Sequence, residues 1–195
     1  NTEAIELING KSQWTGSILK QTKRLSNLIN DLIMLSKMGE RSQLDLTITD
    51  VNISQTITAV VESFQQMAKD QGKYINCNIA PQVHMKTDAK CIYELINILI
   101  DNAVRYTPRN GTINILLDKT KSIVLLKIEN SGRGISEYDL PKIFDRFFRS
   151  DTSRTDGGHG LGLSIAKTGI EKLGGSIEVI SIENKKTIFT VKIPV

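Results

Sequence analysis

The chain has 195 residues, 39% of them hydrophobic and 24% charged, which suits one ordinary domain with a smaller element attached. With 14 Gly, 4 Pro and 2 Cys, it is neither collagen-like nor a disulfide scaffold, and no run approaches the roughly 18 apolar residues of a membrane span. A net charge of +4, spread along the chain, does not indicate a nucleic-acid partner. The two distant cysteines fit a reducing compartment, and the start at Asn1 leads us to expect a piece of a longer protein.

The first forty residues are expected to form two helices. Residues 2–9 predict a short helix that Gly10 ends, and Ser12 can cap a longer helix that runs to about Met38. This longer helix is either a surface helix on its own core or one arm of a helical hairpin that self-associates, and we favour the hairpin. The reason is a heptad seam with little preceding chain to cover it, formed by Ile18, Thr22, Leu25, Ile29, Leu32 and Ser36.

The remaining chain is expected to alternate helices and strands. After a polar hinge at residues 39–50, Ser54 caps a helix that ends at Gly72. Because several adjacent strands are joined by tight turns, the pattern predicts the α+β class: a two-layer α/β sandwich with helices on one face of a largely antiparallel sheet. Further helices are expected at residues 88–106, near 137–142 and at 161–173, and strands at 74–80, 112–118, 123–129, 177–182 and 187–193.

A polar stretch near the end of one predicted helix is the first candidate for chemistry. At residues 101–106, Asn102 places a carboxamide on an otherwise apolar helix. Alone, it is either a satisfied interior polar group or a neutral oxygen ligand for Mg²⁺. One turn onward, Arg105 can meet a phosphate and Tyr106 can lie against a base.

Two glycine-rich segments are the other candidates. Residues 130–135 (NSGRGI) are either a simple turn or a backbone that approaches a flat ligand closely, with a polar side chain before the glycines to recognise the edge of a base. Residues 157–163 (GGHGLGL) open a helix and present free N–H groups suited to phosphate. His159 is a ligand, a catalytic base or an incidental solvent-facing side chain, and we favour the last. No P-loop lysine motif, zinc-ligand spacing or Gly-x-Ser-x-Gly nucleophile motif occurs.

Taken in order, these segments resemble the cytoplasmic end of bacterial sensor histidine kinases of two-component systems. Residues 29–37 (INDLIMLSK) resemble the second helix of the family's dimerisation and phosphoacceptor hairpin. The later motifs are similar to the N box at 101–108 (DNAVRYTP), the first glycine box at 130–135, the F box at 144–149 (FDRFFR), the second glycine box at 158–163, and the family's ending at 187–189 with Pro194.

The resemblance implies a Bergerat-type ATP-binding fold of the GHKL superfamily, shared with gyrase, a heat-shock chaperone family and mismatch-repair ATPases. It implies part of a helical hairpin in residues 1–41 and the catalytic ATP-binding domain in residues 42–195. The implied protein binds ATP and Mg²⁺ and transfers the γ-phosphoryl group to a histidine and onward to a response-regulator aspartate. It is a homodimer through the hairpin, and it lies on the cytoplasmic side of a membrane to which it is anchored.

The resemblance also assigns roles to single residues. Asn102 holds Mg²⁺, Arg105 contacts the phosphates, and Tyr106 packs against the nucleotide. Asn130 takes the adenine-reading position, with Thr187 assisting. The other expected cofactor-binding residues are Gly132, Gly134, Ile135, Gly158, Gly160, Leu161, Gly162 and Leu163.

A mobile ATP lid is expected over residues 150–160, anchored by Phe144 and Phe147. Arg149 is expected to be catalytic, stabilising charge during phosphoryl transfer, which depends mostly on positioning and electrostatics.

The chain departs from the family's pattern at three places. Asn130 stands where the family usually has Asp; its amide oxygen can still accept from the adenine amino group, but the missing charge predicts weaker binding. Ile98 stands one helical turn before Asn102, where the family usually has a second Asn. The phosphoacceptor histidine and its neighbouring acid are absent, and neither His84 nor His159 lies on the predicted hairpin to replace it.

Two alternatives to a sensor kinase remain open. One is a degenerate kinase that acts as a scaffold or phosphatase because Ile98 and Asn130 have abolished useful ATP binding. The other is a related ATPase or anti-sigma serine kinase on the same fold, against which the long heptad helix argues. We favour the kinase, which in this form is expected not to phosphorylate itself.

Overall fold

The computed structural model describes residues 13–39, 47–150 and 159–195, and the chain divides into two compact units, residues 1–42 and 43–195. In the first unit, α2 (Gln13–Gly39) is a helix of 27 residues, in agreement with the longer predicted helix. The short helix expected at residues 2–9 lies outside the described residues. The same holds for the side chains of Leu32 and Ser36 in the predicted seam. Among the described residues, no helix is long and apolar enough to cross a membrane.

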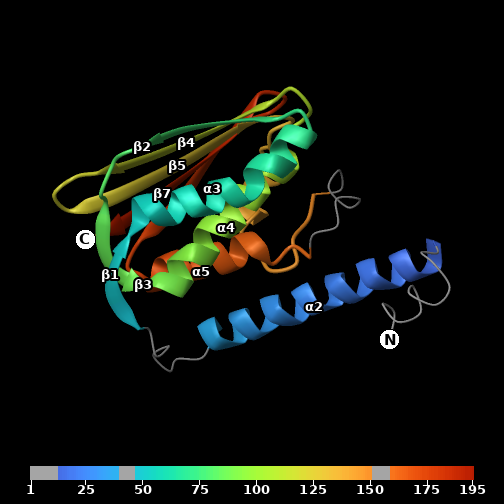
Figure 1. Cartoon of the computed structure of the whole chain (residues 1–195), viewed down its shortest axis with the longest axis horizontal. Helices are drawn as coiled ribbons and strands as arrows, with labels where there is room; N and C mark the ends of the chain where they lie inside the picture. The colour runs from blue at the N-terminus through green and yellow to red at the C-terminus, as the bar shows by residue number, and fades with distance from the viewer. Residues whose placement is uncertain (1–12, 40–46, 151–158) are drawn as a thin grey trace. The chain divides into compact units, whose positions relative to one another are not determined.

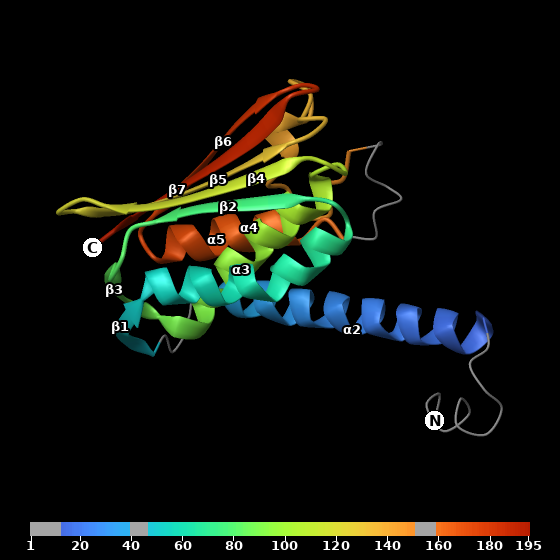
Figure 2. The same cartoon turned by 45° about the horizontal axis from the view of Figure 1, so that its top comes forward.

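The second unit has two layers (Figure 1). One layer is a five-stranded sheet in the order β2-β4-β5-β7-β6, and the other consists of three helices on one face of that sheet (Figure 2). The helices are α3 (Ile53–Asp70), α4 (Ala89–Tyr106) and α5 (Gly162–Lys172), and α4 packs between the other two. The strands are β2 (Tyr74–Ile79), β4 (Thr112–Lys119), β5 (Ile123–Ser131), β6 (Ser176–Ile182) and β7 (Lys186–Pro194).

The pairing of the strands confirms a largely antiparallel sheet. Only β2 and β4 run parallel, while β4, β5, β7 and β6 pair antiparallel in turn. A separate two-stranded sheet pairs β1 (Ile48–Asn52) with β3 (His84–Asp88). The α+β sandwich expected from the sequence is therefore confirmed.

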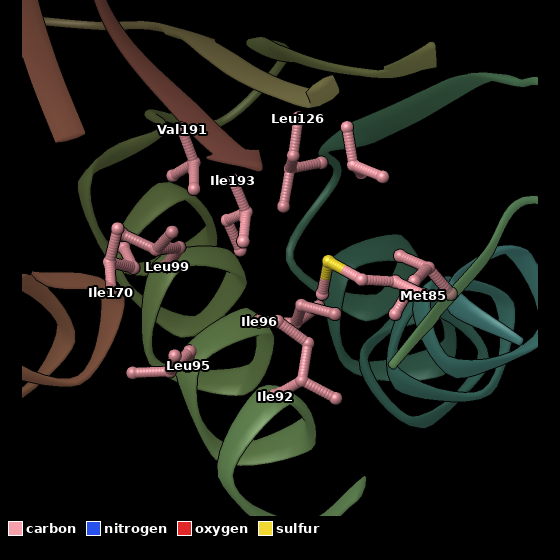
Figure 3. A pocket seen from close by; sticks show the side chains of 11 residues that line it. Met85, Ile92, Leu95, Ile96, Leu99, Leu126, Ile170, Val191 and Ile193 are labelled. Carbon is pink, nitrogen blue, oxygen red and sulfur yellow. The ribbon is translucent and has the colours of Figure 1, made fainter. Parts of the chain in front are cut away.

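Alternation along the strands builds the core. Every second residue of β5 and β7 is buried, which turns one face of the sheet toward the helices. The facing stripe of α4 is fully buried and includes Leu95, Ile96, Leu99 and Ile100. Between the amino-terminal half of α4 and strands β5 and β7, apolar side chains surround a cavity of about 20 Å³ (Figure 3). An apolar cavity of this kind stays dry, so it is a packing defect within the core.

Three sequence expectations differ from the structure. The α3 cap is Asn52, whose side chain accepts from the Gln55 N–H; Ser54 is already helical and instead bonds the Ala80 carbonyl and the Val83 N–H. Neither strand of the small sheet was expected: β1 begins within the predicted polar hinge at residues 39–50, and the five residues of β3 lie directly before the stronger helix signal of α4. The short helix near residues 137–142 is a single 3₁₀ turn at Leu140–Lys142.

Candidate functional site

Helix α4 carries three of the predicted site residues at its carboxyl-terminal end. Its start is capped by Asp88, which accepts from the Cys91 N–H at 2.8 Å, and near its end the Lys73 ammonium donates to the Val104 carbonyl at 2.8 Å. Both contacts satisfy groups that a helix end otherwise leaves unpaired. Asn102 is half-buried there, and its carboxamide makes no hydrogen bond with any described residue. The amide oxygen is therefore available to a ligand or a metal ion.

Arg105 and Tyr106 occupy the last turn of α4. The Arg105 guanidinium is exposed and pairs with the Asp101 carboxylate at 2.9 Å, so part of its charge is already balanced. Tyr106 is half-buried, and the Arg133 guanidinium lies 5.3 Å from the centre of its ring. This cation–π contact joins the end of α4 to the first glycine segment.

The glycines of residues 130–135 hold the backbone in close contact with two neighbours. A Cβ atom on Gly132 would lie 2.6 Å from the Tyr106 carbonyl oxygen, and one on Gly134 would lie 2.5 Å from the Ile182 carbonyl oxygen. Both residues also have positive φ angles, 153° and 70°. The close approach seen here is to the protein's own helix end and strand, and the expected approach to a flat ligand stays a prediction.

Three polar side chains form a row across the inner face of the sheet. Asn130 of β5 pairs in register with Thr187 of β7, which pairs with Ser181 of β6. Asn130 and Thr187 are only 3% and 6% exposed. The Asn130 Nδ2 donates to the Ser131 carbonyl at 3.1 Å, and the Thr187 and Ser181 hydroxyls lie 2.9 Å apart. We call Asn130, Thr187 and Ser181 the polar row.

Ser181 was not among the predicted site residues. Its hydroxyl accepts from the Ile135 N–H at 2.8 Å and therefore ties the glycine loop to the sheet. The signal that points to it is positional: once β6 and β7 are paired, Ser181 is the residue opposite Thr187. A single strand pattern does not reveal that register. Ile135 itself is partly buried against the core, so its contribution here is its backbone N–H.

The second glycine segment leads into α5 beside α4. A Cβ atom on Gly162 would lie 3.3 Å from the Ile98 side chain of α4. Because Ile98 is one helical turn before Asn102, the start of α5 packs against the turn of α4 that precedes Asn102. Leu161 is fully buried and Leu163 is partly buried against the core, so Leu161 can offer a ligand only its backbone. Gly158 lies outside the described residues. An open helix start with glycines is suited to an anion.

The F box at residues 144–149 precedes this segment in the sequence. Phe144 packs edge-on against Phe189 with ring centres 6.4 Å apart, whereas the Phe147 side chain is 60% exposed and its φ is 65°. The Phe147 backbone N–H donates to the Gly160 carbonyl at 2.8 Å, at the end of the predicted lid, whose residues 151–158 lie outside the described residues. Anchoring of the lid by Phe144 and Phe147 stays a prediction. Arg149 is half-buried at the end of the box.

These residues lie at one end of the sandwich. The dry cavity lies at the other end: Val124, which lines it, is six residues before Asn130 on β5, or about 20 Å along the strand. In the described part of the chain, no three His, Cys, Asp or Glu side chains gather as metal ligands. A cation at the site would take its ligands from an amide oxygen, phosphate and water.

Comparisons with known proteins agree with this arrangement. Residues 87–195 match the family described as histidine kinase-, DNA gyrase B-, and HSP90-like ATPase. The chain belongs to this family. Its match begins at β3 and includes α4, both glycine segments and the polar row, so it contains every predicted site residue. An ATPase domain implies ATP as the ligand, and the predicted histidine kinase ATP-binding domain is confirmed.

The individual relatives are a sensor protein and histidine kinases. The sensor protein SrrB of Staphylococcus aureus is 35% identical over 91% of this chain, which spans only 30% of the length of SrrB. The histidine kinase AdeS of Acinetobacter baumannii is 27% identical, with a TM-score of 0.79 over 98% of this chain and 90% of AdeS. The histidine kinase ThkA, solved in complex with the response regulator protein TrrA, is 24% identical and shows the same fold, with a TM-score of 0.75 over 94% of this chain and 51% of ThkA.

Proposed function

We propose that residues 42–195 bind Mg-ATP as the catalytic domain of a sensor histidine kinase. In the longer protein, this domain transfers the γ-phosphoryl group to a histidine, from which it passes to a response-regulator aspartate. The observation that carries the proposal is the meeting, at one end of the sandwich, of the α4 carboxyl-terminal turns, the glycine loop of residues 130–135 and the polar row. Each belongs to the segment that matches the ATPase family.

The polar row supports a purine site. Adenine presents an amino donor beside the ring acceptor N1, and Asn130 and Thr187 present an amide and a hydroxyl side by side in an otherwise apolar layer. Gly132 brings the loop backbone close to this pair, since a Cβ atom there would lie 3.7 Å from Asn130 Nδ2. Tyr106 provides an aromatic face at the end of α4, next to the same loop.

The residues present also fit a magnesium ion. The Asn102 carboxamide is the proposed protein ligand, because a neutral oxygen with no partner among the described residues suits a cation that otherwise binds phosphate and water. When bound, Mg²⁺ neutralises charge on the phosphates. Arg105, Arg149 and the N–H groups at the start of α5 are proposed to bind the remaining phosphate charge.

The first unit supports the proposal of a homodimer. Among the described side chains of α2, Ile18, Leu25 and Ile29 are 52%, 59% and 47% exposed, and all three belong to the predicted heptad seam. A second copy of the hairpin in residues 1–41 is proposed to cover them. A response regulator is the proposed partner, supported by the ThkA–TrrA complex, and membrane anchoring of the longer protein is supported by relatives that are sensor proteins.

Calorimetric titration with a non-hydrolysable ATP analogue and Mg²⁺ tests the proposal. Binding is expected in the wild type and is expected to vanish in Asn102→Ala. Asn97→Ala is the matched control, because it removes the same amide from the same helix about 140° around its axis. Equal binding by all three proteins would contradict the role of Asn102. A wild type that gives no heat would favour the degenerate scaffold or phosphatase, for which Ile98 and Asn130 are the specific observations.

The absence of a suitable histidine gives a second test. The described His84 lies in β3, and His159 lies just before α5, so neither is on α2. With labelled ATP, this chain is expected to incorporate no acid-labile phosphate. Label recovered on His84 or His159 would contradict the proposed role of the hairpin as the phosphoacceptor.

A further inference from the structure

The polar row contains no charged group at the position that reads the base. A carboxylate there can only accept hydrogen bonds, and it therefore rejects a purine with an oxygen at position 6. Asn130 carries both an acceptor and a donor group. Its Nδ2 uses one hydrogen for the Ser131 carbonyl at 3.1 Å, which leaves the second hydrogen and the Oδ1 acceptor for a base.

The hydroxyl pair beside Asn130 can also reverse. Ser181 Oγ has three contacts: it accepts from the Ile135 N–H at 2.8 Å, lies 3.0 Å from the Lys186 carbonyl, and lies 2.9 Å from Thr187 Oγ1. Ser181 has one proton for the last two contacts. If it donates to Lys186, Thr187 donates to Ser181 and presents only lone pairs to the base. If it donates to Thr187, the Thr187 proton is free to point at the base.

These two arrangements match the two kinds of purine edge. Adenine has an amino donor next to the acceptor N1, which pairs with Asn130 Oδ1 and a donating Thr187. Guanine and hypoxanthine have an acceptor O6 next to the donor N1–H, which pairs with the free Asn130 N–H and an accepting Thr187. Changing from the arrangement that suits guanine to the one that suits adenine gives up the bond from Ser181 to the Lys186 carbonyl and gains one from Thr187 to the base, and it exposes no buried charge.

We propose that this site binds 6-oxopurine nucleotides, those of guanine and hypoxanthine, in addition to ATP, with Asn130 as the specificity-determining residue. The inference rests on the proposed function, since it requires the base to lie at the polar row. Ser181 is a positioning residue in this scheme, because it accepts a hydrogen bond from Thr187 or donates one to it without contacting the base. The polar row stays uncharged in both arrangements of its hydroxyl groups.

Competition calorimetry with ATP, GTP and inosine triphosphate tests the inference on the wild type. Inosine triphosphate shares the 6-oxo edge of guanine without the 2-amino group. Its affinity, and that of GTP, are expected to be within about tenfold of ATP, the effect of one neutral hydrogen bond. Affinities for both that are more than about a hundredfold below that of ATP would overturn the inference, while leaving the proposed ATP site intact. Failure of ATP itself to bind would instead refute the proposed function.

A carboxylate at position 130 provides the second measurement. In Asn130→Asp, the ratio of ATP affinity to inosine triphosphate affinity is expected to rise at least about tenfold. The introduced carboxylate can only accept hydrogen bonds, so it repels the O6 acceptor of the 6-oxopurine and still accepts from the adenine amino group. Asn114→Asp is the matched control: it adds the same charge on an exposed β4 position and retains the acceptor for the Asn76 amide, so the ratio is expected to stay unchanged. A folded Asn130→Asp protein with an unchanged ratio would overturn the role of Asn130. If that variant does not fold, the wild-type ratios alone decide the inference.

Discussion

Replacement of Gly134 by alanine is the perturbation that tests the geometry of the glycine loop most sharply. The residue has φ of 70°, and its added Cβ atom would lie 2.5 Å from the Ile182 carbonyl oxygen and 2.9 Å from the Glu183 Cα. Ordinary contacts of this kind begin at 3.4 Å. The loop and the β6–β7 turn must therefore separate by roughly 1 Å, or the turn must rebuild.

Three hydrogen bonds hold these two segments together and would lengthen with that separation. They run from the Gly132 N–H to the Lys185 carbonyl at 3.0 Å, from the Asn184 N–H to the Arg133 carbonyl at 2.6 Å, and from the Ile135 N–H to Ser181 Oγ at 2.8 Å. At about 1 kcal/mol each, their loss costs about 3 kcal/mol. A left-handed conformation for alanine adds about 1 kcal/mol, so about 4 kcal/mol is expected in total.

Urea unfolding and ATP calorimetry measure the two consequences. Gly174→Ala is the matched control, because φ there is 73° but no atom lies within 4 Å of the added Cβ. That variant is expected to lose only about 1 kcal/mol and to bind ATP like the wild type. Gly134→Ala is expected to lose about 3 kcal/mol more and to bind ATP poorly. Equal losses in the two variants, with ATP binding retained in both, would refute this reasoning.

Four further predictions concern the core and the thiols. Thr87→Val removes a buried hydroxyl that has no hydrogen-bond partner, so urea unfolding is expected to show a free energy of unfolding higher by about 1 kcal/mol. A lower free energy of unfolding would contradict the view that this hydroxyl is unpaired. Leu95→Ala enlarges the apolar cavity, and the same assay is expected to show a loss of about 3–5 kcal/mol, whereas a loss below about 1 kcal/mol would mean that the core collapses around it. Burial, followed by the charge of Asp88, raises the pKa of the Cys91 thiol to about 11, so iodoacetamide at pH 8 is expected to modify exposed Cys77 first. Because folding favours the neutral Cys91 thiol, its contribution to stability is complete below pH 9 and is lost as the pH rises toward 11; the alkaline loss is expected to shrink in Cys91→Ala.

The long elements could be predicted because their signals are local. The buried stripe of α4 repeats at helical spacing, and its cap Asp88 lies directly before it. The strands β5 and β7 alternate over nine residues each. In these cases the pattern alone determines which face is buried.

The remaining features depend on partners distant in sequence. Ser54 is as good a cap as Asn52 by residue type, and only the fold shows that its hydroxyl is used by the turn between β2 and β3. The parallel pairing of β2 with β4 is set by the intervening α4. Ser181 acquires its role from the register of three strands, which no single segment encodes.

In the proposed complex, an amide-bound magnesium ion and a purine at the polar row occupy one end of the sandwich. A crystal structure of the chain with Mg²⁺ and a non-hydrolysable ATP analogue tests it most directly. We expect the base against Asn130 and Thr187, with the metal ion on the Asn102 side-chain oxygen. A nucleotide bound elsewhere, or that space filled by the protein's own side chains, would contradict it.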